Sequence, residues 1–197
     1  MFISFEGLDG SGKTTQAELL AESLRGDGRD VVTTREPGGT QLGEEVRRLL
    51  LGGFEMSPWA EASLFAAARA ELVERVIAPA LQSGSDVVCD RYIDSSLAYQ
   101  GIARELGVEH VLEVNLAATR GLLPDRTFLV LVDPDVALER SAPSDRIERE
   151  GPEFHRAVDR AYRALVEMFP DRITTVNGDR PAEAIAEEIR GRLRELS

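Results

Sequence analysis

The sequence predicts an α/β fold in which a five-stranded parallel sheet carries helices on both faces. Short apolar segments alternate with amphipathic ones along all 197 residues, which is the pattern of strands joined by crossover helices. Two of the apolar segments, 87–89 and 128–132, contain no polar residue, as is typical of strands covered on both faces. A glycine-rich segment also separates the first expected strand from the first expected helix, where α/β folds bind phosphates.

The five strands are expected where short apolar or β-branched runs are bounded by turn-forming residues. They are residues 2–6, 30–33, 86–90, 127–133 and 172–176. No linker-like block and no internal repeat interrupts the alternation, so we expect a single domain over residues 1–197.

The helices are expected where apolar residues recur at helical spacing. They are residues 14–24, 42–51, 58–82, 94–105, 109–119, 134–141, 152–169 and 181–196. Pro134, Pro152 and Pro181 stand where the first turn of a helix tolerates proline. Pro79 falls inside a helical pattern and predicts a kink or an end. The charged, loop-like segment 138–151 is the expected short lid.

Composition and charge limit the partners. The formal net charge is −12, and such a surface repels phosphate backbones, so we expect no nucleic-acid partner. No apolar stretch approaches the ~18 residues of a membrane span, and the first residues lack the pattern of a signal peptide. The single cysteine, Cys89, fits a reducing, cytoplasmic compartment. Basic positions hold 22 arginines and one lysine, which suits halophilic adaptation, although a GC-rich genome would also favour arginine.

Residues 7–14 match the phosphate-binding pattern G-x-x-x-x-G-K-[ST] in full, between an expected strand and an expected helix. Glycines let successive backbone N–H groups point at anionic oxygens, and the helix N-terminus adds positive potential. Lys13 supplies a mobile charge for the β- and γ-phosphates, and the Thr14 hydroxyl is a ligand for Mg²⁺. The segment therefore predicts a P-loop NTPase fold that binds a nucleoside triphosphate with Mg²⁺, and the second substrate must be inferred from other residues.

Lys13 is the only lysine in a chain that uses arginine at every other basic position. A compact ammonium and a planar guanidinium are not interchangeable at a phosphate site. The retention of lysine at this one position therefore indicates a functional role.

Two further segments follow expected strands, and in an open parallel sheet such segments line the ligand crevice. Arg35 can hold a phosphate, although a solvated arginine before a Pro-Gly turn would give the same sequence. Asp90 can order Mg²⁺ opposite Thr14, and Arg91 can neutralise a phosphate. An ordinary Asp–Arg surface pair is the alternative.

Phe65 and Arg69 are four residues apart and share one helix face. A ring and a guanidinium on one face can stack on a base and bond its carbonyl edge. From periodicity alone, however, such a phenylalanine belongs to the core more often than to a ligand platform.

Taken in order, these segments resemble the thymidylate kinase family over roughly residues 2–190. The resemblance is carried by residues 5–15, 34–40, 65–69, 90–100 and 145–148. It implies an ATP-dependent kinase that converts dTMP to dTDP, is usually a homodimer and uses Mg²⁺. Another small P-loop kinase, or a regulatory module that binds ATP without turnover, is the alternative.

The resemblance also implies roles for individual residues. Catalysis would involve Lys13, Asp90, Arg91 and Arg146, with Mg²⁺ held by Thr14 and Asp90. ATP would be bound by Gly7, Leu8, Asp9, Gly10, Ser11, Gly12, Lys13, Thr14, Thr15 and Arg140, and dTMP by Asp9, Arg35, Phe65, Arg69, Arg91, Ser96, Tyr99 and Gln100. Within the second set, Phe65 would stack on thymine and Arg69 would bond its O4. Tyr99 would lie near the sugar 2′ position, and Arg35 with Arg91 would grip the phosphate.

The phosphate loop carries no basic residue at its variable positions, where some family members have one. We therefore expect Arg146, in the short lid, to supply the transition-state charge almost alone, and Arg140 to lie against adenine. A solvated lid charge is the alternative for Arg146. We also expect Glu6 to bind metal water or a sugar hydroxyl, and His110 and His155 to be surface residues.

Overall fold

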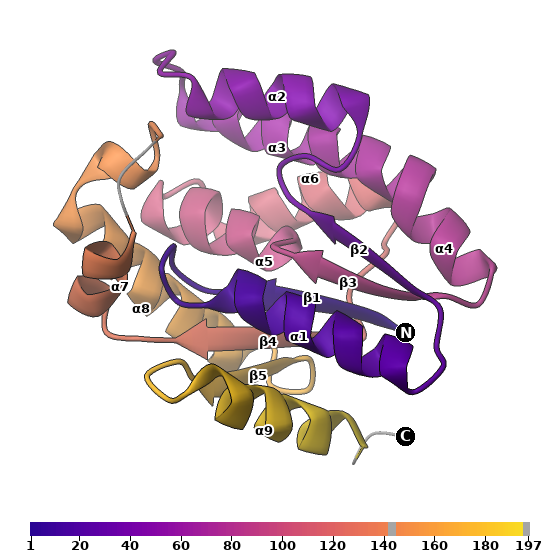
Figure 1. Cartoon of the computed structure of the whole chain (residues 1–197). Helices are drawn as coiled ribbons and strands as arrows, with labels where there is room; N and C mark the ends of the chain where they lie inside the picture. The colour runs from indigo at the N-terminus through magenta and orange to yellow at the C-terminus, as the bar shows by residue number, and fades with distance from the viewer. Residues whose placement is uncertain (142–144, 195–197) are drawn as a thin grey trace.

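A computed structural model describes residues 1–141 and 145–194 of the chain. Its centre is one sheet of five parallel strands in the order β2-β3-β1-β4-β5 (Figure 1). The strands are β1 (Phe2–Glu6), β2 (Val31–Arg35), β3 (Asp86–Asp90), β4 (Arg126–Leu131) and β5 (Ile173–Asn177). The predicted α/β class and the five-stranded parallel sheet are confirmed. The strands β1 and β3 have the predicted bounds, and the ends of the other three differ from the predicted ones by one or two residues.

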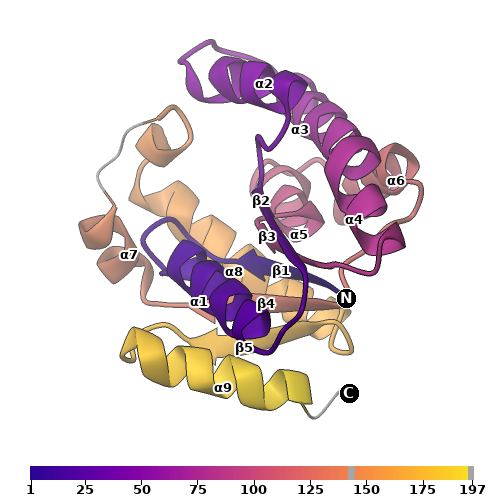
Figure 2. The same cartoon turned by 45° about the vertical axis from the view of Figure 1, so that its right-hand side comes forward.

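Helices cover both faces of the sheet, and Figure 2 shows α1 and α9 together on one of them. The helices are α1 (Lys13–Gly26), α2 (Gln41–Leu51), α3 (Pro58–Leu72), α4 (Ala78–Gln82), α5 (Ile93–Ser96), α6 (Val108–Thr119), α7 (Pro134–Arg140), α8 (Pro152–Met168) and α9 (Ala182–Arg194). The part of the expected helix 181–196 beyond residue 194, and residues 142–144 of the expected lid, lie outside the described residues.

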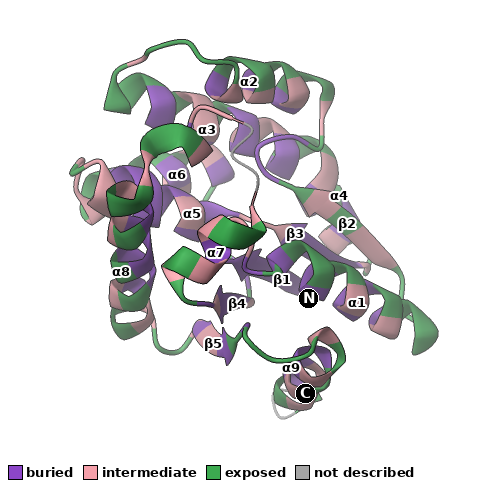
Figure 3. Ribbon diagram, turned by 60° about the vertical axis from the view of Figure 1, so that its left-hand side comes forward, coloured by how far each residue is buried: buried purple, intermediate pink, exposed green. Residues whose placement is uncertain are grey.

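Successive residues of a strand point to opposite faces of the sheet, and each face has its own hydrophobic core. Ile3 and Phe5 of β1 pack with α1 and α9, whereas Phe2 packs with the helices of the opposite face. Figure 3 shows the purple, buried sides of α1 and α8 turned toward the sheet and their green sides turned to solvent. The helix α2 lies on α3, against which it packs Val46 and Leu50, and its Glu44 pairs with Arg35 at the end of β2 (Figures 1 and 3).

Proline positions explain how several helices begin. Pro134 and Pro152 occupy the first turns of α7 and α8, and Pro181 directly precedes α9 and accepts hydrogen bonds from two N–H groups of its first turn. The predicted irregularity at Pro79 is a π-helical turn over Val73–Ile77 between α3 and α4. Because Pro79 has no N–H to donate, the helix there accommodates a wider turn.

A second π-helical segment, Leu97–Ala103, continues α5 where a single helix over 94–105 was predicted. It widens the helix and buries both Tyr99 and Gln100, and such segments often occur at functional sites.

One prediction on the surface is wrong. His155 is only 4% exposed, because its ring packs beside Phe154 and its Nδ1 lies 2.8 Å from the carbonyl oxygen of Gly151. His110, in contrast, is exposed as predicted. No helix within residues 1–141 and 145–194 is both long enough and apolar enough to cross a membrane.

Candidate active site

The phosphate-binding segment connects β1 to α1 at the carboxyl edge of the sheet. Its backbone packs so closely that side chains are excluded at Gly7 and Gly10. A Cβ atom at Gly7 would lie 2.5 Å from the carbonyl oxygen of Val130, and one at Gly10 would lie 2.3 Å from that of Ala137. Both glycines have positive φ angles, 142° and 82°. The loop is therefore held between the sheet and α7.

Asp9 links Lys13 of the phosphate-binding segment to Arg91, which follows β3. Its Oδ1 atom lies 2.8 Å from Lys13 Nζ and 2.8 Å from an Nη atom of Arg91. Burial acts to raise the pKa of Asp9, but the charges of Arg91 and Lys13 outweigh it and lower this pKa well below its ordinary value. The carboxylate is therefore ionised and holds two cations that phosphates would otherwise attract.

Lys13 is buried at the start of α1. Besides Asp9 it reaches the carbonyl oxygen of Leu8 over 3.4 Å. Burial, together with the charge of Arg91, lowers the pKa of Lys13, although Asp9 and Asp90 oppose the shift. Ser11 is also buried in this loop, and its hydroxyl has no partner among the described residues, whereas Thr15 is exposed.

Arg91 directly follows β3 and adopts a left-handed backbone with φ 68°. Its guanidinium donates to Ser95 Oγ over 3.0 Å and to the hydroxyl of Tyr162 over 3.1 Å, and it lies 5.5 Å from the ring centre of Tyr99. A non-glycine residue in this region is strained, and such strain is found where a side chain must be aimed. The backbone turns the Arg91 side chain toward Asp9.

Thr14 and Asp90 meet as the sequence predicted. The Thr14 hydroxyl donates to Asp90 Oδ2 over 2.5 Å. The other oxygen, Oδ1, is buried and has no hydrogen-bond partner among the described residues. A hydroxyl beside a carboxylate with an unpartnered oxygen fits Mg²⁺, which takes few protein ligands and fills its shell with water and phosphate oxygens. Among the described residues, no group of three or more His, Cys, Asp or Glu side chains is placed to hold a metal ion.

Glu6 does not face this crevice, contrary to expectation. It is fully buried beneath it and accepts hydrogen bonds from Tyr92 N, Ser95 N, Ser95 Oγ and Tyr162 Oη. Burial and the neighbouring charge of Asp94 raise the pKa of Glu6 to about 7, against the charge of Arg91. Its four donors give Glu6 a positioning role beneath Arg91 and leave it no contact with the crevice.

A pocket opens beside Asp9 and Arg91, away from the phosphate loop. The predicted residues Phe65, Ser96, Tyr99 and Gln100 line it. The sequence interpretation assigned no role to eight other lining residues, which are Glu36, Pro37, Arg47, Leu51, Ser95, Asp145, Ile147 and Glu148. A ring, hydroxyls and an amide around one cavity suit a planar polar ligand. Phe65 therefore lies at a ligand surface, although one of its sides packs on the core.

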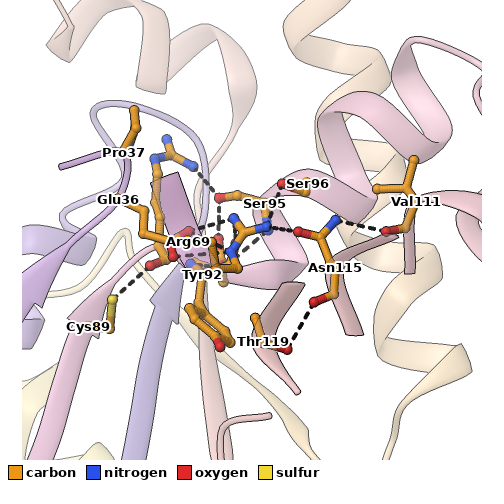
Figure 4. A network of polar contacts seen from close by, with 12 residues as sticks. Glu36, Pro37, Arg69, Cys89, Tyr92, Ser95, Ser96, Val111, Asn115 and Thr119 are labelled. Atoms are coloured by element: carbon orange, nitrogen blue, oxygen red, sulfur yellow. Dashed lines mark hydrogen bonds and ion pairs between the residues drawn. The ribbon is translucent and has the colours of Figure 1, made fainter. Parts of the chain in front are cut away.

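Arg69 is not among the residues that line this pocket. Its five N–H groups are all engaged, and Figure 4 shows the network around it. Nε and one Nη bond Glu36, that same Nη reaches the carbonyl oxygen of Tyr92, and the other Nη bonds Ser96 Oγ and Asn115 Oδ1. The side chain is 1% exposed. Burial acts against the charge of Arg69, but Glu36 outweighs it and raises the pKa of the guanidinium.

Arg35 stands apart from the pocket. It is exposed, pairs with Glu44 over 3.2 Å and borders a neighbouring groove that also includes Thr14 and Asp90. It therefore lies beside Thr14 and Asp90 and away from Phe65.

Arg146 is not near the phosphate loop. Its Nε donates to the carbonyl oxygen of Leu50 over 3.0 Å at the end of α2, and an Nη atom lies 2.5 Å from Glu61 of α3. These contacts place the lid segment 145–150 against the pocket. Arg140, at the end of α7, lies 3.7 Å from Asp179, which follows β5.

The comparisons with known proteins show the family and the fold. The family model described as "Thymidylate kinase" matches residues 5–189. A thymidylate kinase of Synechococcus sp. (strain JA-3-3Ab) is 50% identical over 94% of this chain and 92% of its own, and one of Symbiobacterium thermophilum is 46% identical over 100% and 94%. The crystal structure of thymidylate kinase from Ehrlichia chaffeensis superposes with a TM-score of 0.84 at 34% identity, over 98% of both chains. The fold is that of a P-loop NTPase, and the chain belongs to the thymidylate kinase family.

Proposed function

We propose that this chain transfers the γ-phosphoryl group of ATP to dTMP, giving ADP and dTDP for dTTP synthesis. It is an ATP-dependent phosphotransferase, as its family membership requires. The observation that best supports this function is that Asp9 bridges two cations. This carboxylate joins Lys13 of the phosphate loop to Arg91 at the mouth of the pocket. Two phosphate-bearing ligands would therefore meet there.

ATP would be held by the backbone of residues 7–15 and by the N-terminus of α1. The N–H groups of this loop and the helix dipole favour anions. The buried ammonium of Lys13 bonds Asp9 in this structure. When ATP binds, it would leave Asp9 and bond the β- and γ-phosphates instead. Arg140 would lie against adenine, close to the segment that follows β5.

Mg²⁺ would be held by Thr14 and by Asp90, directly or through water. The unpartnered Oδ1 atom of Asp90 supports this assignment. When bound, the ion neutralises charge on the phosphates between which the phosphoryl group moves.

dTMP would occupy the pocket that Phe65 lines, with the pyrimidine ring stacked on Phe65 and the sugar beside Tyr99. Ser96 and Gln100 border the part of the cavity left for the base. Arg69 would bond the base carbonyl only after releasing one of its partners. The Nη atom of Arg69 that bonds Ser96 would turn to the base, because Ser96 itself lines the cavity.

The acceptor phosphate needs little activation, because its second pKa is about 6 and it is largely ionised at neutral pH. Catalysis then depends on alignment and on neutralising two anionic ligands. Arg91 would hold the acceptor phosphate, and Arg35 would join it after leaving Glu44 and turning toward the pocket. Arg146 would supply charge to the transferring group after leaving Glu61, so this role requires a movement of the lid segment.

The family assignment disfavours another small P-loop kinase. Lys13, Thr14, Asp90 and Arg91 stand together at one site, and this argues against a regulatory module without turnover. An assay of ADP release with dTMP, dUMP, dCMP, AMP and shikimate tests the function. We expect preference for dTMP; preference for another acceptor, or nucleotide binding without ADP release on adding dTMP, would refute it.

The chain would act in the cytoplasm as a homodimer. Its one cysteine, Cys89, is a buried free thiol, as suits a reducing compartment. Trp59, at the start of α3, is 43% exposed, and a large aromatic residue on the surface supports an interface there. Light scattering should give twice the monomer mass, and Trp59→Asp should shift the chain toward the monomer.

A further inference from the structure

Glu61 is a buried carboxylate that the family resemblance did not single out. It lies on α3, one helical turn before Phe65, and is only 2% exposed. It accepts hydrogen bonds from Gln100 Nε2 over 2.9 Å, from Arg104 Nε over 3.2 Å and from Arg146 over 2.5 Å. One carboxylate thus joins α3 to the π-helical segment that carries Gln100 and to the lid segment.

These partners keep the Glu61 carboxylate ionised. Burial acts to raise its pKa, but hydrogen bonds from Gln100 and Arg146, with the charge of Arg104, outweigh it and the pKa lies below its ordinary value. An ionised carboxylate accepts hydrogen bonds and donates none. Gln100 must therefore turn its NH₂ group, and not its carbonyl oxygen, toward Glu61.

The orientation of the Gln100 amide leaves its carbonyl oxygen, Oε1, for the pocket. Gln100 lines the pocket wall, and Oε1 accepts no hydrogen bond from any residue within 1–141 or 145–194. An acceptor without a protein donor at the wall of a pocket is available to a ligand that presents an N–H group there.

We propose that Glu61 is a positioning residue for base selection: it fixes the Gln100 amide so that Oε1 accepts an N–H group of the acceptor base. Thymine and uracil carry a hydrogen on ring nitrogen N3, whereas cytosine has a bare acceptor nitrogen there. An oxygen held against that nitrogen rejects cytosine. The inference rests on the proposed binding of the acceptor nucleotide in this pocket.

The test is an internal competition between dTMP and dCMP, with both products measured in one reaction mixture. Because both substrates share one enzyme sample, the ratio of their kcat/KM values does not depend on the fraction that is folded. Glu61→Gln can accept or donate at position 61, so Gln100 can take either orientation. We expect the dTMP-to-dCMP ratio to fall about tenfold or more.

Three variants separate positioning from general damage. Glu61→Asp keeps an acceptor-only group and should retain most of the preference. Glu150→Gln changes a carboxylate that contacts Arg104 and Arg146 but not Gln100, so it should leave the ratio unchanged. In a Gln100→Ala background, Glu61→Gln should have no further effect on the ratio.

The outcomes are distinct from those that test the proposed function. If the unmodified chain phosphorylates dTMP but Glu61→Gln keeps the ratio within about threefold, the role of Glu61 is refuted and the function stands. The role is also refuted if Glu150→Gln lowers the ratio as much as Glu61→Gln does. If the unmodified chain does not phosphorylate dTMP at all, the function itself fails.

Discussion

The carboxylate of Asp9 lies 2.8 Å from the guanidinium of Arg91, across the boundary between the phosphate loop and the pocket that Phe65 lines. The same carboxylate oxygen lies 2.8 Å from Lys13. Two cations that would attract phosphates are therefore kept together by one anion before any ligand binds. Phosphate oxygens arriving from either side would compete with Asp9 for these cations, so the two subsites share one charge centre.

Replacing the only lysine with arginine tests whether this centre requires an ammonium. Lys13→Arg should lower kcat about 100-fold, because a planar guanidinium cannot occupy the buried position that Nζ takes beside Asp9 and Leu8. Steady-state kinetics with ATP and dTMP would measure the loss. The reverse exchange on the exposed end of α1, Arg25→Lys, should leave kcat unchanged. Activity of Lys13→Arg within tenfold of the original would show that position 13 tolerates either cation.

Arg146 is the residue expected to supply transition-state charge, although its guanidinium lies on Glu61 in this structure. Arg146→Ala should lower kcat about 10³-fold, as removal of such an arginine does in related chemistry. Rates at saturating ATP and dTMP would measure it, with Arg149→Ala as the neighbouring control. A loss of less than tenfold would show that Arg146 does not supply this charge and only holds the lid segment to Glu61 and Leu50.

The close contact of Gly10 with α7 predicts that no side chain fits at this position. In Gly10→Ala, the new methyl would lie 2.3 Å from the carbonyl oxygen of Ala137, at a φ of 82°. We expect a loss of about 1–3 kcal/mol in the free energy of unfolding and a higher KM for ATP. Gly53→Ala is a control with φ 88° and no atom within 4 Å of the added Cβ, and it should leave the KM for ATP unchanged. An unchanged KM in Gly10→Ala would contradict the contact.

Asp90 should set the requirement for Mg²⁺. Asp90→Asn should raise the Mg²⁺ concentration for half-maximal rate by about 10- to 100-fold, since the amide lacks the charge of the carboxylate. Titration of the initial rate with MgCl₂ measures this shift. Thr14→Ser keeps the hydroxyl that bonds Asp90 and should behave like the original chain. If Asp90→Asn left the Mg²⁺ requirement unchanged, the metal would have to be held elsewhere.

Glu6 gives a prediction on stability and pH. Its pKa is raised from 4.5 to about 7, so the folded state binds more protons than the unfolded state between these values. The contribution of Glu6 to stability is then largest below pH 4.5 and falls as the pH rises toward 7, by about 3 kcal/mol. Denaturant unfolding of the original chain and of Glu6→Gln should show their difference changing in that direction. A difference that does not vary with pH would contradict the shift.

The fold could be predicted because each signal was local. Short stretches of sequence contain these signals, which are the alternation of strand and helix, the loop at 7–14 and the prolines in the first turns of α7 and α8. The pairing of Thr14 with Asp90 was also predictable, because the carboxyl ends of parallel strands meet at one edge of the sheet.

The parts of the site that were missed depend on contacts distant in sequence. Glu61 shares the helix face of Phe65 and Arg69, yet only the folded chain brings Gln100 and Arg146 to it. Burial of His155 likewise depends on its packing, which helical spacing does not specify. The donors of Arg69 are engaged by four residues from three separate segments, which are Glu36, then Tyr92 with Ser96, then Asn115 (Figure 4).

The most direct measurement follows the phosphoryl group itself. The chain would be mixed with ATP labelled in the γ-phosphate, Mg²⁺ and excess dTMP for less than one turnover, and the labelled products would be separated. We predict label in the β-phosphate of dTDP, with an equal amount of ADP, and no label transferred when dTMP is left out. Label recovered as inorganic phosphate, or none transferred to dTMP, would contradict it.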